Sequence, residues 1–535
     1  MFFAIVRKEL SNHMASFRFW VGALLTIILA FSSTLIAAQD YDLRLESYQQ
    51  RVSSAQRELQ TVSVYSYLQP VAVRPPEPLS VLDQGFESRL GTEVAIHPFS
   101  IPVAATAGYR GNELLVSLPT VDLTTIVSGV LGLLALLLTH DSILGEREGG
   151  TLRAVFAHGV KRSTLLAGKL TGGLLTLCLP LAVGLLVTLS LFRFEAGISL
   201  TIDQWLRVAG LVGAYVAYLC LMLLLGLLIS LHSRSTSRAL GLSVLGWFVL
   251  TIVIPGAARA VAGDLVETGG ARRGSEREIA GLMAEQDRRL AEELRRDPLR
   301  TAFSGHTAIS FANGEHRAVR YRNGSAAYYD SLADYYRFEV KSGTRYASQV
   351  LTIQRRYEGR LRAGERLGTG LAVISPAFLL DLLSESFAGT SVAEYDRFLA
   401  DCRRYRLTLL AYMERKGAFR SWRWFTDDPP GGLHPWPGYL GLSPGEVTPE
   451  RVGPLFSRLS EPEVAARVRR DREVIQRDPA RRLPLEDRPR FIYRGPEFSS
   501  SLRHGAAAAG VLLAFNVLAA AAVWARFRRY DLGEG

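Results

Sequence analysis

Cysteine is scarce in this chain, with only three among 535 residues. Cys178 and Cys220 fall within long apolar runs, and Cys402 stands alone in the largest polar region. No intrachain disulfide framework is therefore available to that polar region. Its stability must come from helix packing and from burial of apolar surface, at about 25 cal/mol per Å².

The chain also lacks the short motifs of several enzyme classes. A phosphate-binding loop needs spaced glycines and a Lys followed by Ser or Thr. Here Lys169 is followed by Leu170, and Ser163 stands where the upstream glycine is required. There is no H-E-x-x-H zinc helix and no G-x-S-x-G nucleophile elbow. We therefore expect no catalytic residue, metal or cofactor in this chain, and any ATP hydrolysis must take place on another polypeptide.

The net charge of +11 would suggest a nucleic-acid partner for a soluble protein. Much of the basic excess, however, lies beside the apolar runs, where lipid headgroups and membrane topology account for it. No zinc-finger spacing accompanies it. Nucleic acid is therefore not an expected partner, whereas membrane lipid is.

Long apolar runs are what the sequence has in abundance. A run of about 20 residues is long enough to cross about 30 Å of hydrocarbon as a helix. The sequence predicts six such helices, at residues 19–38, 123–140, 170–191, 206–231, 239–258 and 506–525. The predicted fold class is an α-helical polytopic membrane protein with six transmembrane helices and a mostly α extracytoplasmic domain with minor β structure.

Basic residues in the short loops predict the orientation, because Lys and Arg concentrate on the cytoplasmic side. They are found in the segment 141–169, in the turn 232–238 and after the last run, in the tail 526–535. Both termini are thus expected in the cytoplasm, and residues 39–119 and 259–503 outside. Residues 1–18 alternate apolar and charged residues and predict a helix lying on the inner leaflet. No small-residue cleavage site follows the first run, which is predicted to be an anchor.

The two polar regions differ in predicted structure. The first, residues 39–119, begins with a helical extension of the first span and is broken by four prolines at 70, 75, 76 and 78. Its remainder contains the runs VAIHPFSIPVAATA and ELLVSLP, which predict one or two strands. The second, residues 259–503, begins with a charged helix that Pro298 ends. Ser325–Arg366 and Val392–Lys416 are predicted to be antiparallel helices packed together, and Arg482–Tyr493 is predicted to be a strand.

Three features of the second polar region suggest a ligand, and for each a structural role is favoured. His306 and His316, beside Asn313 and Glu315, suggest a metal, but scattered surface histidines are commoner. The tryptophans of the irregular segment 421–444 are expected to form an aromatic core or a membrane-interface belt, and a platform for ligand stacking is the alternative. The arginine-rich run 467–482 is expected to be a solvated helix face, and lipid binding is the alternative. The residues are Trp422, Trp424 and Trp436 and the run from Arg467 to Arg482.

The segment Asp141–Lys169 lies between the second and third apolar runs and contains the sequence GEREGGTLR. Acidic residues there precede a predicted helix start, where the helix dipole favours them. Thr151 is predicted to cap that helix, and Leu152, Ala154 and Val155 to form its apolar face. Asp141, at the end of the second run, has two open roles: part of an ion path, or a cap or ion-pair partner for nearby arginines.

This segment resembles the GERE-x-GTL…R…GK loop of ABC transporter permeases of the type-2 exporter class. The amphipathic start resembles the elbow helix of the same class. Three further stretches resemble the subset with a large extracytoplasmic insertion, a domain of unknown function, between the fifth and sixth spans. They are RPPEPLSVLDQGFESRLG in the first polar region, Ile374–Arg406, and the C-terminal FNVLAAAAVWARFRRYDLG.

The resemblance implies a permease subunit of the bacterial inner membrane. In that class the loop between the second and third spans presses on a separate ATPase, and two permease chains, identical or paralogous, work on two ATPase subunits that carry ATP and Mg²⁺. The residues that match the loop, and so are expected to couple to the ATPase, are Asp141, Gly145, Glu146, Arg147, Glu148, Gly150, Thr151, Leu152 and Arg153.

Alternating access driven by ATP would then export a substrate that the sequence does not identify. A second reading is a signalling or mechanical protein, in which the same machine moves the extracytoplasmic domain to act on a periplasmic partner and carries nothing across. A third, a membrane-anchored hydrolase, has no motif to support it.

Overall fold

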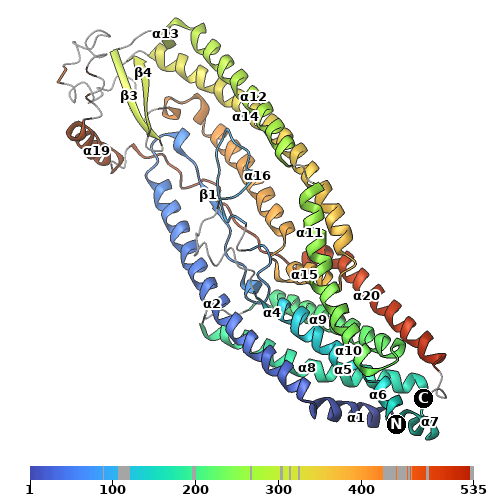
Figure 1. The fold of residues 1–535 in the computed structure, drawn as a ribbon. Helices are drawn as coiled ribbons and strands as arrows, with labels where there is room; N and C mark the ends of the chain where they lie inside the picture. The colour runs from blue at the N-terminus through green and yellow to red at the C-terminus, as the bar shows by residue number, and fades with distance from the viewer. Residues whose placement is uncertain are drawn as a thin grey trace.

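The computed structural model describes residues 1–87, 90–106, 121–195, 200–265, 268–301, 305–312, 315–322, 326–425, 441–442, 455, 458, 461–477 and 481–530. The molecule is elongated, with a helical bundle at one end and a polar domain at the other (Figure 1). We call the bundle end that carries both termini the basic end. The polar domain comprises the described parts of residues 61–106 and 266–497. Two predicted segments, ELLVSLP and the tail beyond Tyr530, lie outside the described residues.

Within the described residues, six helices are long and apolar enough to cross a membrane, and each contains one of the six predicted spans. The fold class predicted from the sequence is therefore confirmed. The helices are α2 (Phe17–Gln60), α4–η3–α5 (Leu123–Ile126, Val127–Leu131, Gly132–Thr139), α8 (Arg162–Glu195), α9 (Ile202–His232), α10–η4 (Thr236–Phe248, Val249–Val253) leading into α11 (Ile254–Leu265), and α20 (Phe498–Arg528). The segments η3 and η4 are π-helical turns, and Pro180 is accommodated inside α8.

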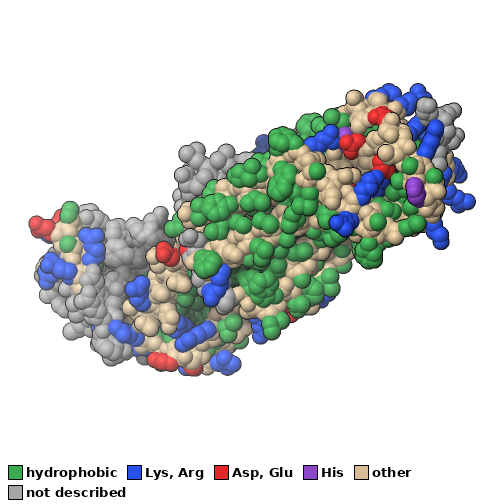
Figure 2. Space-filling model, turned by 90° about the horizontal axis from the view of Figure 1, so that it is seen from below, with side chains coloured by type: hydrophobic (Ala, Val, Ile, Leu, Met, Phe, Trp, Pro, Cys, Tyr) green, Lys and Arg blue, Asp and Glu red, His purple; other side chains and the backbone are tan. Residues whose placement is uncertain are grey.

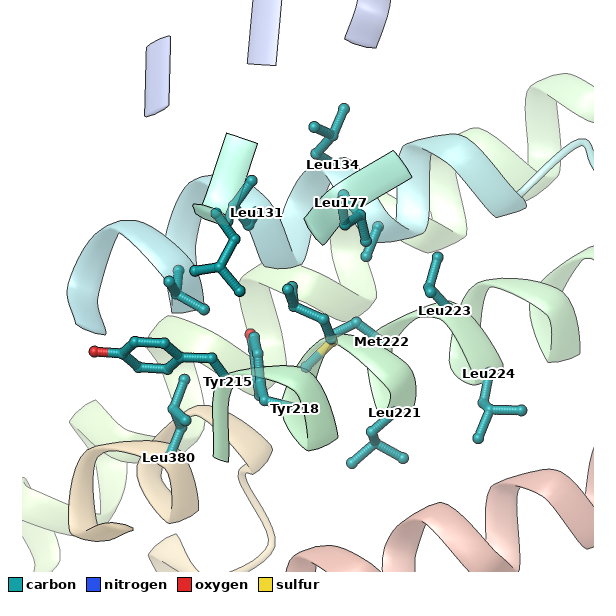
Figure 3. Packing of buried hydrophobic residues seen from close by; sticks show 14 of the residues in the cluster. Leu131, Leu134, Leu177, Tyr215, Tyr218, Leu221, Met222, Leu223, Leu224 and Leu380 are labelled. Atoms are coloured by element: carbon teal, nitrogen blue, oxygen red, sulfur yellow. The ribbon is translucent and has the colours of Figure 1, made fainter. Parts of the chain in front are cut away.

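Helix α9 forms the centre of the bundle and packs against α5, α8, α15 (Pro376–Ala388) and α20. Figure 3 shows its residues Tyr218 and Met222 meeting Leu131 and Leu177 from neighbouring helices. Both residues of α9 are fully buried. The Tyr218 hydroxyl donates to the Ser128 carbonyl at 2.8 Å, within the π-helical turn. A phenol buried in apolar surroundings needs such a partner, and the irregular turn supplies one.

The outward faces of α2, α10 and α20 carry exposed large apolar side chains, as lipid-facing helices do. Figure 2 shows a broad area of hydrophobic side chains over the middle of the molecule, with Lys and Arg gathered at its right-hand end. Examples from three helices are Leu24, Leu245 and Val517. This apolar area and its basic border match the expected position of a bilayer.

Helix α2 continues without a break for 44 residues. At 1.5 Å per residue it is about 66 Å long, roughly twice the hydrocarbon thickness. The predicted extension of the first span is thus confirmed. Beyond it come η1 (Tyr65–Tyr67), β1 (Val71–Val73), η2 (Pro78–Val81) and β2 (Glu93–Ala95). The strands β1 and β2 pair antiparallel, with Val71 opposite Ala95.

Helices α12 (Thr268–Arg296) and α14 (Ala326–Ala372) form a long antiparallel hairpin, joined by α13 (Pro298–Thr301) and the strands β3 (Gly305–Ala312) and β4 (Glu315–Arg322). The expected end of the charged helix before Pro298 is confirmed. Helix α14 packs mainly against α11 and α12 rather than along α16 (Val392–Arg415) as expected, and it reaches the core around α16 through Val340 and Tyr336. Helical spacing in the sequence showed an apolar stripe but not which neighbour covers it.

A second core lies in the polar domain, around α16. It combines Phe398 and Leu409 of α16 with Leu68, Ile96 and residues of the segment 483–493. That segment turns at residues 486–487 and forms no strand ladder, so the strand predicted for Arg482–Tyr493 is wrong. Pro484 and Pro489 lack the backbone N–H that a ladder needs. The segment contacts α16 through side chains instead, with the Tyr405 hydroxyl donating to the Pro489 carbonyl at 3.0 Å.

The structure describes parts of the three features that suggested a ligand, and it gives a structural role to Trp424. Trp424, in η6 (Trp422–Trp424), is 1% exposed and packs edge-on against Phe419 of η5 (Ala418–Arg420), as a core residue does. Trp436 lies outside the described residues. His306 and His316 stand on the separate strands β3 and β4, opposite Tyr321 and Phe311. Arg467, Arg469 and Arg470 are exposed on α19 (Pro462–Arg477).

Candidate functional site

The segment predicted to couple to an ATPase forms two short helices at the basic end, α6 (Leu144–Glu148) and α7 (Thr151–Ala157). The Ser230 hydroxyl of α9 accepts from the backbone N–H groups of Ile143 and Leu144, at 3.3 and 3.2 Å, and so fixes the start of α6. Gly150 separates the two helices with a φ of +70°, a conformation that glycine adopts without strain.

Two expectations about α7 are wrong. Gly150, not Thr151, is its N-cap, and the Thr151 hydroxyl instead donates to the Glu146 carbonyl at 3.2 Å. A turn that needs a positive φ favours glycine over a hydroxyl cap. Ala154 is exposed rather than part of the apolar face, which consists of Leu152 with the half-buried Val155 and Phe156.

Glu146 is held inside the chain by two lysines. Its Oε1 lies 2.7 Å from the Lys8 Nζ and 3.1 Å from the Lys169 Nζ. Lys169 is 2% exposed and also reaches Glu9, at 2.8 Å. Burial disfavours the Lys8 ammonium, but its hydrogen bond to Glu146 raises the pKa of Lys8 above its ordinary value, whereas burial lowers the pKa of His13. This cluster joins α6 to α1 (Phe2–Met14) and to α8.

Glu148 and Arg147 fix the other side of α6. The Glu148 carboxylate accepts from the Thr236 backbone N–H, at 3.3 Å, and from the Thr236 hydroxyl. It thereby caps α10, whose Ser235 N-cap provides no side-chain bond. The Arg147 guanidinium donates to the Tyr530 hydroxyl at 3.3 Å and stacks over its ring at 5.6 Å.

The start of α8 contacts the end of α20. The Arg162 Nη1 donates to the Phe527 and Arg528 carbonyls, the latter at 2.7 Å, and so satisfies two acceptors at the C-terminus of α20. Its guanidinium also lies over the rings of Phe156 in α7 and Phe527 in α20, at 5.7 and 5.8 Å. Arg162 therefore contacts both α7 and the sixth membrane helix, α20.

The nine predicted coupling residues thus occupy different positions in the fold. Asp141, Glu146, Arg147 and Glu148 all contact this chain itself, Asp141 through the Arg18 Nη1 at 3.2 Å. Leu152 is 2% exposed and anchors α7. Thr151 and Arg153 are exposed, Gly145 lies within α6, and Gly150 forms the turn between α6 and α7. The surface that a partner can reach is therefore the outer side of α7.

Sequence reasoning missed the residues that hold α6 in place. Lys8, Lys169 and Tyr530 were recognised only as parts of basic or C-terminal segments, and Ser230 and Thr236 carried no signal. Lys169 did carry one, since a lysine directly before a long apolar run is rarely buried without an acidic partner. Lys169 has two acidic partners. Glu9 is 160 residues earlier in the sequence, and Glu146 lies in the motif itself.

A second charged network lies at the opposite end of the bundle, where the polar domain begins. The Arg207 Nη2 of α9 lies 2.5 Å from the Glu77 Oε1, and its Nη1 lies 3.4 Å from the Phe387 and Ala388 carbonyls. The Arg74 Nη2 lies 2.8 Å from Glu87. All four charged side chains are buried, so each needs its partner.

Four carboxyl groups meet beside this network: Asp83, Asp122 at the N-cap of α4, and Asp381 and Glu385 of α15. Burial and the neighbouring carboxylates raise the pKa of Glu385 to about 8 and that of Asp83 well above its ordinary value. At neutral pH part of this group is therefore protonated. Within the described part of the chain, no group of three or more His, Cys, Asp or Glu side chains has the arrangement of a metal site.

Comparison with known proteins places these features in a family context. A family model described as ABC-2 family transporter protein matches residues 3–271, and a model for a domain of unknown function, DUF3526, matches residues 316–432. The second match spans β4, α14, α15, α16, η5 and η6.

Two curated relatives are both described as probable ABC transporter permease protein NosY. The protein from Pseudomonas aeruginosa is 40% identical over 83 residues, 15% of this chain and 29% of that protein. The protein from Stutzerimonas stutzeri is 29% identical over 154 residues, 28% of this chain and 54% of that protein. This chain thus spans about half the length of the Stutzerimonas stutzeri protein and less than a third of the Pseudomonas aeruginosa protein.

Proposed function

The chain belongs to the ABC-2 family of transporter proteins, and on that premise we propose that it is the permease subunit of an exporter driven by a separate ABC ATPase. Two permease chains, identical or paralogous, would act with two ATPase subunits, which carry the ATP and Mg²⁺. The complex would lie in the bacterial inner membrane with the basic end in the cytoplasm and the polar domain outside. The basic border of the apolar surface supports this orientation.

The observation that carries this proposal is the way α6 is attached. It contacts α1, α8, α9, α10 and the segment after α20, so a push on α7 is passed to the inner ends of most membrane helices at once. The residues that match the family loop divide accordingly. Asp141, Glu146, Arg147 and Glu148 transmit motion within the permease, while Thr151 and Arg153 on α7 meet the ATPase.

This division of roles has a sharp test in the pair Glu148 and Thr236. If Glu148 acts inside the chain, Glu148→Ala and Thr236→Val each lower ATPase activity of the reconstituted complex, Thr236→Val by less because it keeps the backbone N–H that bonds to Glu148. The double variant is then no worse than Glu148→Ala, as expected for one shared interaction. Additive losses would mean that Glu148 also acts elsewhere, at the ATPase. Arg415→Gln, an exposed site on α16, is the control.

A second function is favoured by the continuity of α2 from the basic end into the polar domain. One unbroken helix, with the buried Arg207–Glu77 pair beside it, transmits motion from the membrane to the polar domain. The same machine would then act on a periplasmic partner and carry no substrate. The genes that neighbour the ATPase gene would distinguish the two functions, because genes for an export system and genes for a signalling system encode different proteins.

Shortening the α12–α14 hairpin tests whether the polar domain takes part. Glu278 and Arg356 face each other across the hairpin at 3.4 Å. A short Gly-Ser linker can therefore replace residues 279–355 and keep the parts of α12 and α14 on either side of the cut. We expect basal ATPase activity to persist and function in cells to be lost. Full function of the shortened protein would refute a role for the hairpin in either reading.

A further inference from the structure

A cavity of about 350 Å³ lies in the polar domain, far along α2 from the basic end. Its walls are the last turns of α2, strand β1, Tyr405 of α16 and the segment 488–493. The volume falls in the range of small-molecule sites, toward the lower end. The expected coupling residues do not line this cavity, although Pro75 and Tyr405 belong to stretches that carry the family resemblance.

Most of the lining is apolar or aromatic. Val52 and Leu59 of α2 face Val71 of β1, with Tyr405 and Phe491 beside them. The Tyr405 hydroxyl is already bound to the Pro489 carbonyl, so that its ring rather than its polar atom is available to a ligand. These walls suit an apolar body, and the uncharged polar side chains among them are Tyr48, Gln56 and Tyr493, beside Tyr405.

Two arginines, Arg488 and Arg490, provide the only charge in the lining, and among the described residues no Asp or Glu lines the cavity. Arg490 is exposed. The Arg488 Nη1 reaches the carbonyl of Leu485 at 3.5 Å, a long and weak contact. Arginine presents a planar fork of donors that matches a carboxylate, and a cationic rim beside an apolar wall selects an anion with an apolar body.

We propose that this cavity binds a small organic anion with an apolar body, of the class of medium-chain fatty acids, with its carboxylate on Arg490 and Arg488 and its chain against Val52 and Val71. The inference goes beyond the proposed function, because it concerns a ligand of the polar domain and not the coupling to ATP. The ligand would bridge two segments that continue into the membrane, α2 and the stretch that leads into α20. Binding there would therefore hold the first and sixth membrane helices together.

The test uses the full chain in nanodiscs of zwitterionic lipid and octanoate as the probe. Calorimetric titration, corrected with empty nanodiscs, should show octanoate binding, with octanol and octylammonium binding at least tenfold more weakly. Arg490→Gln should weaken octanoate about tenfold, or about 1.4 kcal/mol, and Arg490→Lys should weaken it less. Val52→Trp, which fills the cavity from a position 38% exposed, should abolish binding.

Arg415→Gln is the matched control, since it removes one exposed arginine of α16 outside the cavity and should leave binding unchanged. Equal melting temperatures for all variants establish that they fold. The proposal is overturned if octanoate does not bind, if octylammonium binds as tightly, or if Val52→Trp binds octanoate like the unmodified protein. None of these outcomes bears on the ATPase measurements, so the two proposals fail independently.

Discussion

The Arg207 guanidinium lies 2.5 Å from the Glu77 carboxylate, and this pair ties the fourth membrane helix to the polar domain. Only 2% of the Arg207 side chain and 9% of the Glu77 side chain are exposed. Asp203, one turn before Arg207, adds a second carboxylate at 3.5 Å. An ion pair buried to this degree is costly to break, because either partner left alone is a charge without compensation.

Removing one partner of this pair should therefore destabilise the protein. We expect Glu77→Gln or Arg207→Met to lower the free energy of unfolding by about 3–5 kcal/mol, measured by thermal or denaturant unfolding in detergent. The double variant Glu77→Leu with Arg207→Met should recover much of the loss. Glu285→Gln, in an exposed pair of α12, should cause no measurable change. A loss for Glu77→Gln no greater than for Glu285→Gln would contradict this account.

Lys169 should be the most sensitive residue of the basic end. Lys169→Met leaves the carboxylates of Glu9 and Glu146 without their buried partner, and we expect a loss of about 3–5 kcal/mol together with reduced ATPase coupling. Lys8→Met removes a lysine that is 47% exposed, and its loss should stay below about 1 kcal/mol. If the two variants behave alike, burial of Lys169 does not determine the strength of this cluster.

The carboxyl group of Glu385 should make stability fall as pH rises. Its pKa is about 8 in the folded protein and about 4.5 in the unfolded chain, so the folded state holds an extra proton between these values. Its stabilising contribution is complete below about pH 4.5 and is lost as pH rises through about 8, a change on the order of a few kcal/mol. Asp83, facing Asp122, Asp381 and Glu385, acts in the same direction.

Melting temperatures between pH 5 and pH 8.5 measure this effect. Glu385→Gln should flatten the decrease relative to the unmodified protein, while Glu414→Gln, at an exposed position of α16, should leave it unchanged. An unaltered slope in Glu385→Gln would show that this carboxyl group is not the one that titrates.

The proposed orientation can be checked with an impermeant thiol reagent in intact cells. In a background without Cys178, Cys220 and Cys402, a cysteine at Ser348 of α14 should be labelled, and one at Ser163, at the start of α8, should be labelled only after the cells are opened. Both positions are exposed to solvent. Equal labelling of the two in intact cells would exclude the proposed topology.

The sequence was sufficient for the membrane helices and for the outward extension of α2, because apolar runs and helical periodicity are local properties. The same local reading predicted a strand across Pro484 and Pro489, where the missing N–H groups of proline should have counted against it. The same local reading predicted Thr151 to be the N-cap of α7. Gly150 is the N-cap instead, because glycine readily adopts the left-handed conformation found there.

Long-range pairings could not be predicted in this way. Arg207 lies in an apolar helix and its partner Glu77 is 130 residues earlier. Nothing in either local sequence indicates the other. The packing of α12 along α14 is a similar case, since the charged sequence of α12 did not indicate α14 as its neighbour. At the coupling segment, which residues of the motif face inward depends on Lys8, Lys169, Ser230, Thr236 and Tyr530.

The measurement that tests the central claim most directly is site-specific cross-linking between α7 and a co-expressed ABC ATPase. Cysteines at Ala154 and Arg153, both exposed, should cross-link to the ATPase, whereas a cysteine at Leu152, which is 2% exposed, should not. A cysteine at Ser348 in the polar domain is the negative control. Cross-linking from Ala154 and not from Ser348 is the predicted result. An ATPase that co-purifies with the chain but cross-links at Ser348 and never at Ala154 or Arg153 would contradict coupling through α7.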